Sequence, residues 1–186
     1  MAFNIQNIKS ALVDGGARSS LFEVQIFFPD DVDVPNKQSV MTEKISFLCK
    51  ASNIPASTLS TIEVPYFGRK IKVAGSRTFA EWSVTILNDE DFAIRIAMEE
   101  WMQAINQHSS NLRANGTSSS PESYKGEAVV RQFAKDEETP IRKYKFEGCW
   151  PSEVSQIDLD WENENDIEEF TVTFQYDLWE PDNTPD

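Results

Sequence analysis

The sequence predicts a mainly β protein, an antiparallel β-barrel or sandwich with one flanking α-helix. About eight or nine short segments alternate apolar and polar residues, as strands with one buried face do. One segment has helical periodicity instead, from Asp89 or Glu90 to about Gln107. Because helices do not alternate with strands along the chain, parallel βαβ units are disfavoured and an antiparallel architecture is favoured.

The length of 186 residues, 40% of them hydrophobic, suits a single domain over 1–186 with a sizeable core. We expect an N-terminal arm with a short helix over 1–17 and a flexible tail over 181–186. Ile5, Ile8 and Leu12 have helical spacing, and a Gly-Gly pair ends the segment. Such a short helix needs a surface to dock on, in the same chain or in another.

The first half of the chain contains five expected strand segments. They are SLFEVQIFF (20–28), KISFLCKAS (44–52), STLSTIEVPYF (57–67), KIKV (70–73) and FAEWSVTIL (79–87). The polar segment 29–42, with two prolines, is expected to be a loop. AGSRT (74–78) is expected to be the turn that joins the last two strands in a hairpin. Pro65 suits an edge strand or an extended arm rather than a central strand.

The second half begins with the expected helix. Its apolar stripe is Ile94, Ala97, Met98, Trp101, Met102 and Ile105, and Asp89, Glu90 and Asp91 are expected in its first turn, where the helix dipole favours anions. After a Ser/Asn-rich loop we expect strands at 127–135, 141–150, 154–161 and 167–180. The last of these has the clearest alternation, through Phe170, Val172 and Phe174.

The residues that would carry catalysis or bind a metal are missing. His108 is the single histidine, and no serine or cysteine lies in a nucleophile elbow. Cys49 and Cys149 are expected to be reduced, buried thiols. The acids around Trp161 indicate a glycosidase or a calcium site only weakly, since their spacing does not fit an EF-hand loop. We therefore expect no enzyme, cofactor or metal.

Targeting signals are also missing from the sequence. It has no apolar run of about 18 residues and no secretory signal pattern, so we expect folding in a cytoplasm without membrane insertion.

The net charge of −14 is unevenly distributed. Residues 152–186 hold twelve acids and no Lys or Arg, whereas basic residues cluster at 69–77 and 142–145. Opposite charges on one chain favour pairing within the chain or between copies of it. The same balance argues against wrapping nucleic acid, which needs a cationic surface.

Four blocks of the sequence together resemble the major tail tube protein of contractile-tailed bacteriophages. They are CKASNIPASTLSTIEVPYFGRK, RKIKVAGSRTFAEWSVTILNDEDF, VVRQFAKD and GCWPSEVSQIDLDWENENDIEEFTVTFQYDLWE. Their order and spacing also agree, so the resemblance covers roughly residues 18–180. The chain departs from the family pattern at 29–42, at 109–123 and after Glu180, and no family role is transferred to those regions.

The resemblance implies a structural protein with a fold shared by the tube proteins of pyocins and type VI secretion. It implies a homo-hexamer that stacks into a tube, with tail sheath, baseplate and tail terminator proteins as partners. Tape measure protein and DNA would pass through the lumen without specific binding. The protein would be assembled in the host cytoplasm and would reside in the virion, as the inner tail tube.

The resemblance and the charge pattern give two sets of candidate site residues. Candidates for contacts between subunits or rings are Ile54, Pro55, Val64, Tyr66, Phe67, Arg69, Lys70 and Lys72, with the two lysines reaching acids on an adjacent copy. For Ile54, Val64, Tyr66 and Phe67 the alternative is burial in the chain's own core. Acidic candidates for the lumen, where carboxylates would repel DNA, are Asp160, Glu168 and Glu169.

Two other functions remain open from the sequence. The chain could be the tube subunit of an injection machine without a capsid, such as a pyocin or type VI system. It could also be a monomeric sandwich that binds carbohydrate through Trp82, Trp150 or Trp161.

Overall fold

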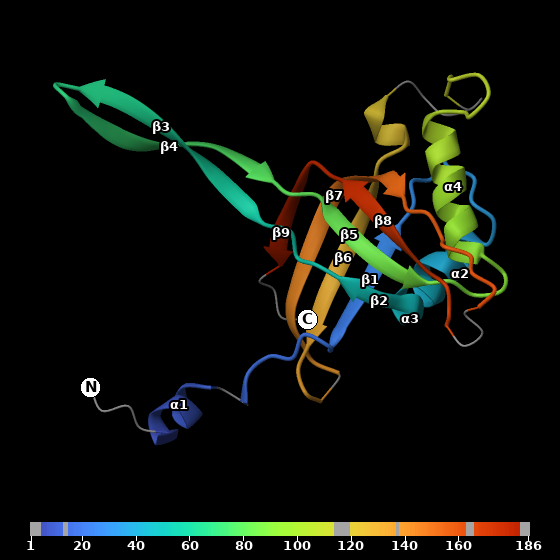
Figure 1. Cartoon of the computed structure of the whole chain (residues 1–186), viewed down its shortest axis with the longest axis horizontal. Helices are drawn as coiled ribbons and strands as arrows, with labels where there is room; N and C mark the ends of the chain where they lie inside the picture. Colours follow the sequence, from blue (N-terminus) through green and yellow to red (C-terminus); the bar gives the residue numbers. More distant parts are fainter. Residues whose placement is uncertain (1–4, 13–14, 114–119, 137, 163–165, 183–186) are drawn as a thin grey trace.

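The computed structural model describes residues 5–12, 15–113, 120–136, 138–162 and 166–182. Its body is an antiparallel sheet in the order β1-β6-β7-β8-β5-β2, with β9 also paired to β7. A separate two-stranded hairpin, β3–β4, projects from this body (Figure 1). Helix α4 covers one side of the body. The mainly β, antiparallel fold predicted from the sequence is confirmed.

The strands are β1 (Phe22–Phe27), β2 (Cys49–Ser52), β3 (Ser57–Tyr66), β4 (Arg69–Phe79), β5 (Trp82–Leu87), β6 (Gly126–Phe133), β7 (Pro140–Val154), β8 (Glu169–Gln175) and β9 (Leu178–Asp182). The helices are α1 (Ile5–Ala11), α2 (Lys37–Ser39), the π-helix η2 (Val40–Lys44), α3 (Ile45–Leu48), α4 (Ala93–Ile105) and the 3₁₀-helix η3 (Pro121–Ser123). No helix within the described ranges is long and apolar enough to cross a membrane.

The long strand β7 joins the two halves of the sheet. Its residues 143–147 pair with β9, and its residues from Trp150 onward pair with β8. Gly148 lies between these two pairings with φ of 70°, a conformation that glycine adopts without a steric penalty. The carboxylate of Asp177 lies against Gly148, and the backbone N–H of Asp177 donates to the carbonyl of Glu147. Because β7 changes its pairing partner at Gly148, the segment 167–180 forms two strands, β8 and β9, instead of the single strand that was expected.

The core lies between the sheet and α4. The expected stripe of α4 is buried through Ile94, Ala97, Met98 and Trp101. The Trp101 ring meets Phe28 edge-on at 5.0 Å, and its indole N–H donates to the carbonyl of Tyr124 at 2.7 Å. These contacts fix the helix against the sheet, as its hydrophobic periodicity predicts.

Trp82 forms the centre of the core on the sheet side. Its ring stacks on Phe146 at 4.6 Å and packs against Phe174 at 5.0 Å. Both cysteines are free thiols; Cys149 is buried, as expected, whereas Cys49 is half-buried. Desolvation raises the pKa of each thiol to about 12. Neither thiol is therefore a ready nucleophile.

Three expectations about the first half of the chain are wrong. Helices α2, η2 and α3 occupy part of the expected loop 29–42 and the start of the expected strand 44–52, because a helical path buries Val40 and Ile45 together. The segment 74–78 is no turn, because it lies inside β4. The real hairpin turn is Phe67-Gly68, where both residues have positive φ, as a two-residue type I′ turn requires.

Three further expectations fail closer to the C-terminus. Helix α4 begins at Ala93, so Asp89, Glu90 and Asp91 precede it instead of lying in its first turn. The expected strand 154–161 is wrong, because β7 ends at Val154 and the chain then leaves the sheet. Pro181 and Asp182 belong to β9 rather than to a tail; residues 183–186, like 114–119 of the Ser-rich loop, lie outside the described residues.

Candidate assembly surfaces

The β3–β4 hairpin is an arm that stands away from the sheet (Figure 1). Its strands pair with each other from Ser57↔Phe79 to Tyr66↔Arg69, and in the described chain they pair with no other strand. Almost every side chain along it is exposed. Since an isolated two-stranded hairpin is marginally stable in water, this arm needs a partner surface.

The hairpin exposes an unusual amount of apolar surface. Exposed apolar residues on it are Leu59, Ile62, Val64, Tyr66, Phe67, Ile71 and Val73. Val64, Tyr66 and Phe67 are therefore not part of the chain's own core, and neither is Ile54 at the root of the arm. Pro55, by contrast, is buried, so the expectation that it forms part of a contact surface is not supported by its position. A contiguous exposed apolar patch marks an interaction site.

Phe67 occupies the tip of the arm. Its side chain is 91% exposed and meets the ring of Tyr66 edge-on at 4.7 Å. Its φ of 42° is unfavourable for an aromatic residue, and a costly backbone conformation of this kind is typical of a functional position. Sequence reasoning missed this turn, because Phe is rarely found at a position of positive φ.

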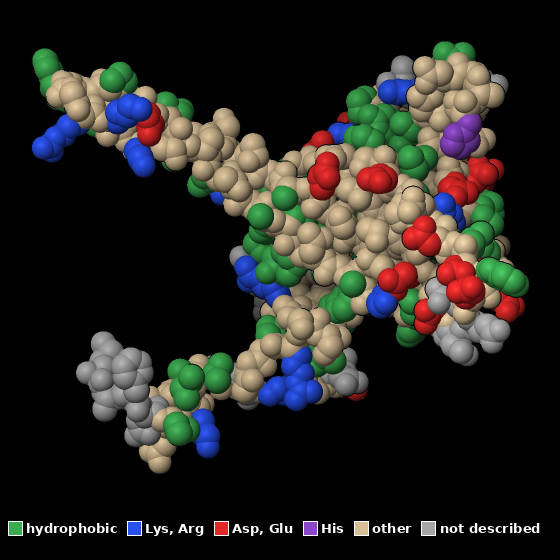
Figure 2. Space-filling model, viewed as in Figure 1, with side chains coloured by type: hydrophobic (Ala, Val, Ile, Leu, Met, Phe, Trp, Pro, Cys, Tyr) green, Lys and Arg blue, Asp and Glu red, His purple; other side chains and the backbone are tan. Residues whose placement is uncertain are grey.

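The arm is basic. It carries Arg69, Lys70, Lys72 and Arg77 against the single acid Glu63, and its basic side chains stand apart from the acidic side chains of the body in Figure 2. Lys70 forms an ion pair with Glu63 of its own chain at 2.6 Å, and Arg77 donates to the hydroxyl of Ser57. One of the two lysines expected to reach an adjacent copy thus already has a partner within the hairpin.

The root of the arm is fixed to the sheet. The backbone N–H of Ala80 donates to the carbonyl of Ala56 at 3.0 Å, and the Tyr176 hydroxyl donates to the carbonyl of Ala80. Phe79 packs against the ring of Trp179, with 6.0 Å between ring centroids. The arm therefore leaves the body in a defined direction.

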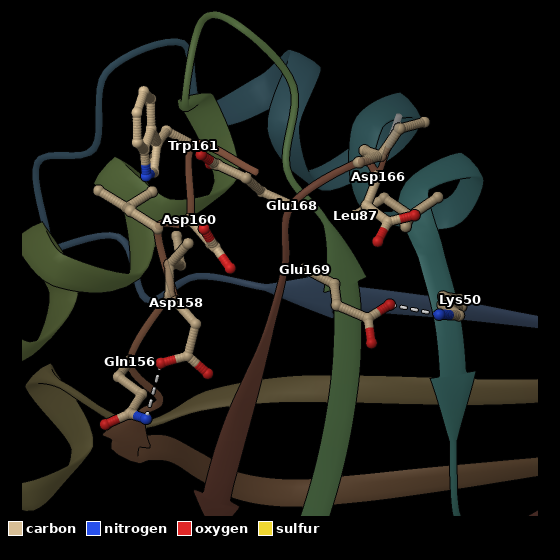
Figure 3. Close-up of a pocket in the computed structure, with 12 residues that line it drawn as sticks. Lys50, Leu87, Gln156, Asp158, Asp160, Trp161, Asp166, Glu168 and Glu169 are labelled. Atoms are coloured by element: carbon tan, nitrogen blue, oxygen red, sulfur yellow. Dashed lines mark hydrogen bonds and ion pairs between the residues drawn. The ribbon is translucent and has the colours of Figure 1, made fainter. Parts of the chain in front are cut away.

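The second candidate surface is a groove of about 1130 Å³ where β5 ends and β8 begins. It brings together all three expected lumen acids, Asp160, Glu168 and Glu169 (Figure 3). Glu169 forms an ion pair with Lys50 across the groove, and the Asn88 side chain donates to Glu168 at 3.1 Å. That these acids face a lumen stays a prediction.

The groove also has an apolar wall that sequence reasoning missed. Leu159, Trp161 and Ile167 line it and are 81%, 93% and 68% exposed. Leu159 and Trp161 lie in the expected strand 154–161, but the chain leaves the sheet after Val154 and exposes both side chains. The signal in the sequence that could have indicated this wall is the occurrence of Leu159, Trp161 and Ile167 among acidic residues.

Metal and carbohydrate sites were the other possibilities that the sequence left open. Within the described ranges no group of three or more His, Cys, Asp or Glu side chains could hold a metal ion. Trp82 is fully buried and Trp150 is half-buried against Tyr124, so the three tryptophans considered for carbohydrate binding form no common platform.

Comparisons with a family model and with individual proteins both find phage tail tube proteins. The family model for phage tail tube proteins matches residues 17–181. The tail tube protein gp19 of Enterobacteria phage T4 is 37% identical over 164 residues, which are 88% of this chain and 91% of that protein. A tail tube protein of Serratia phage KSP90 is 28% identical over 174 residues, or 92% of this chain and 93% of the relative.

Solved structures of low sequence identity share the fold. The tube-terminating cap of the anti-feeding prophage has a TM-score of 0.65 at 16% identity and covers 93% of this chain and 95% of its own. A chain of the sheath–tube complex of an extracellular contractile injection system has a TM-score of 0.58 at 13% identity and covers 97% and 99%.

Proposed function

Because the chain belongs to the phage tail tube protein family, we propose that six copies of it form a ring and that the rings stack into the inner tube of a contractile tail. The family is established by the match over residues 17–181 and by the 37% identity to the T4 protein. The role of the chain is therefore structural, and the resemblance stated from the sequence is confirmed. Relatives from phages favour a phage tail over an injection machine without a capsid.

The observation that carries the stacking is the exposed hairpin. Its tip and its apolar side chains are left exposed by the described part of the chain, while its root is anchored to the sheet. A projecting arm that binds a different surface on the next copy makes a heterologous contact. Such contacts give an open stack when the operation that relates the copies does not close on itself, as between successive rings. The contact candidates that fit this role are Ile54, Val64, Tyr66, Phe67, Arg69, Lys70 and Lys72.

A tube of stacked rings has partners around it, at its ends and in its channel. We propose that a sheath surrounds it and that a baseplate and a terminator bound its ends. The similar structures come from assemblies that contain a sheath, a baseplate or a terminator. DNA and a tape measure protein would pass along the channel in the virion. The net charge of −14 supports passage without binding, because carboxylates repel phosphates.

Negative-stain electron microscopy of the purified full chain at rising concentration tests the proposal. We expect six-fold rings or tubes with a central channel. A chain that stays monomeric at every concentration, even when preformed tube ends or a baseplate are supplied, would overturn it.

A substitution at the hairpin tip tests the role of the arm. Phe67→Asn removes the exposed ring but keeps a residue that tolerates positive φ. We expect the variant to lose tube formation while its melting temperature stays that of the parent. Phe47→Asn is the matched control, since Phe47 is 84% exposed on α3. Equal assembly of both variants would remove the tip from the interface.

A further inference from the structure

We propose that helix α1 of one copy docks into the acidic, apolar groove at Trp161 of a second copy. This contact is separate from the hairpin contact proposed above. It joins two exposed features of the described chain: a short amphipathic helix and a groove of matching chemistry.

Helix α1 is not covered by any other part of the chain that the structure describes. None of its residues is buried, and Ile5, Ile8 and Leu12 are 72%, 59% and 50% exposed. A helix of seven residues is too short to be stable alone in water. Its apolar stripe therefore indicates a helix that packs against another surface when it is formed.

The position of helix α1 indicates that its docking surface belongs to another copy. The chain after α1 is attached near the end of β6, where the Gln132 side chain donates to the carbonyl of Arg18 and Phe133 N–H donates to the carbonyl of Leu21. The groove lies instead at the end of β5 and the start of β8. Helix α1 and this end of β5 lie on opposite sides of the body (Figure 1). The helix thus extends away from its own groove.

The groove offers apolar contact and negative charge together. Leu159, Trp161 and Ile167 form its apolar wall, and Asp158, Asp160 and Asp166 lie beside them. Among the described residues none of these three aspartates forms an ion pair, whereas the groove's Lys50 is already paired with Glu169. The groove is therefore suited to an apolar segment that carries a positive charge.

Helix α1 has that chemistry. Its one charged residue is Lys9, which lies one turn after Ile5 on the same face. The stripe can pack on Trp161 and Leu159 while Lys9 reaches the aspartates. Seven helical residues span about 10 Å, which a groove of about 1130 Å³ can receive. When helix α1 of a neighbouring copy is docked, Asp160 faces that copy. Docking at this groove and a lumen position therefore exclude each other for Asp160.

Site-directed crosslinking in the full chain tests the contact. Ile8→Cys and Leu159→Cys are made in separate chains, mixed, and treated with a short bifunctional thiol reagent. The chain without added cysteines reports any reaction of Cys49, which is half-buried, or of the buried Cys149. Leu112→Cys is the matched control for Leu159→Cys, because Leu112 is also an exposed leucine and does not line the groove.

We expect a crosslinked dimer from Ile8→Cys with Leu159→Cys and little from Ile8→Cys with Leu112→Cys. Lys9→Glu should weaken the association by about fivefold, the upper range for an exposed ion pair. Equal yields with both partners would overturn the proposal, as would an intrachain link in the Ile8→Cys/Leu159→Cys double variant at concentrations that give no dimer.

The outcome is separable from that of the tube proposal. If tubes form in microscopy and the crosslink fails, the α1 contact is wrong and the tube stands. If the crosslink forms and no tube is ever seen, the docking stands and the tube proposal is wrong.

Discussion

At the residue scale, Lys44 ties the helical segment η2 to the start of α4. Its ammonium forms ion pairs with Asp89, at 2.8 Å, and with Asp91. Asp91 also accepts the backbone N–H of Ala93 at 3.1 Å, at the first residue of the helix. The hydrogen bond from Lys44, followed by that from Ala93, lowers the pKa of Asp91 from 3.8 to about 2, and the same aspartates raise the pKa of Lys44.

This pair predicts a pH dependence of stability. Because the pKa of Asp91 is lower in the folded chain than in the unfolded chain, its contribution is present above pH 3.8 and is lost as the pH falls toward about 2. Urea denaturation of the parent and of Asp91→Asn should show a difference in unfolding free energy that is constant above that window and decreases as the pH falls through it. A difference that does not decrease across the window would contradict the assignment.

At the element scale, Gly126 lets β1, β6 and α4 approach closely. A Cβ at this position would clash with the backbone carbonyl of Phe27 and would meet the Trp101 ring at 3.1 Å. Gly126→Ala should therefore destabilise the fold by about 1–3 kcal/mol, because a backbone carbonyl in a strand pair cannot move aside. Denaturant unfolding measures the change.

The neighbouring substitution Glu127→Ala serves as the control for Gly126→Ala. Glu127 is exposed, and its ion pair with Lys145 is of a kind that contributes at most about 1 kcal/mol. A Gly126→Ala variant no less stable than Glu127→Ala would show that the strands can separate at this point.

The elements that the sequence predicted well are those whose burial follows a simple period. Strands β1, β5 and β8 and helix α4 each have one apolar face, and that face is buried as their alternation or helical spacing predicts. The strand prediction for 44–52 was wrong because Ile45 and Phe47 alternate with polar residues as in a strand. In the structure both lie on helix α3, and Phe47 is exposed.

Gly75 misled the prediction of the hairpin turn. It suggested a turn at 74–78, but it lies inside β4, where a Cβ would clash with the Ser60 side chain of the paired strand. The close approach of two strands requires glycine as readily as a turn does, and the sequence alone does not distinguish the two.

At the scale of the whole molecule, the candidate surfaces were partly predictable. Pro65 and the alternation around it indicated an extended arm, and the structure places the arm's residues outside the core. The groove was not predictable, because it combines β2, the end of β5 and the loop before β8, which only the folded chain brings together. The opposition of a basic arm and an acidic body is visible in Figure 2.

This opposition predicts that assembly depends on the charge of the hairpin. Lys70→Glu/Lys72→Glu leaves Arg69 and Arg77 as the only bases of the arm beside three acids. We expect tubes of this variant to form only at higher protein concentration, with the defect reduced at high salt because screening weakens repulsion between exposed charges. The melting temperature should change little, since the exposed Lys70–Glu63 pair contributes little to folding.

An exchange variant separates the arm's net charge from the Lys70–Glu63 pair. Glu63→Lys/Lys70→Glu keeps the arm's net charge and keeps opposite charges at the paired positions 63 and 70. If the charge of the arm is what the neighbouring copy recognises, this variant should assemble at the parent's concentration while Lys70→Glu/Lys72→Glu does not. Electron microscopy and light scattering across a concentration series measure both. Assembly of the double glutamate variant at the parent's concentration would show that apolar contacts alone hold the arm, with no contribution from its charge.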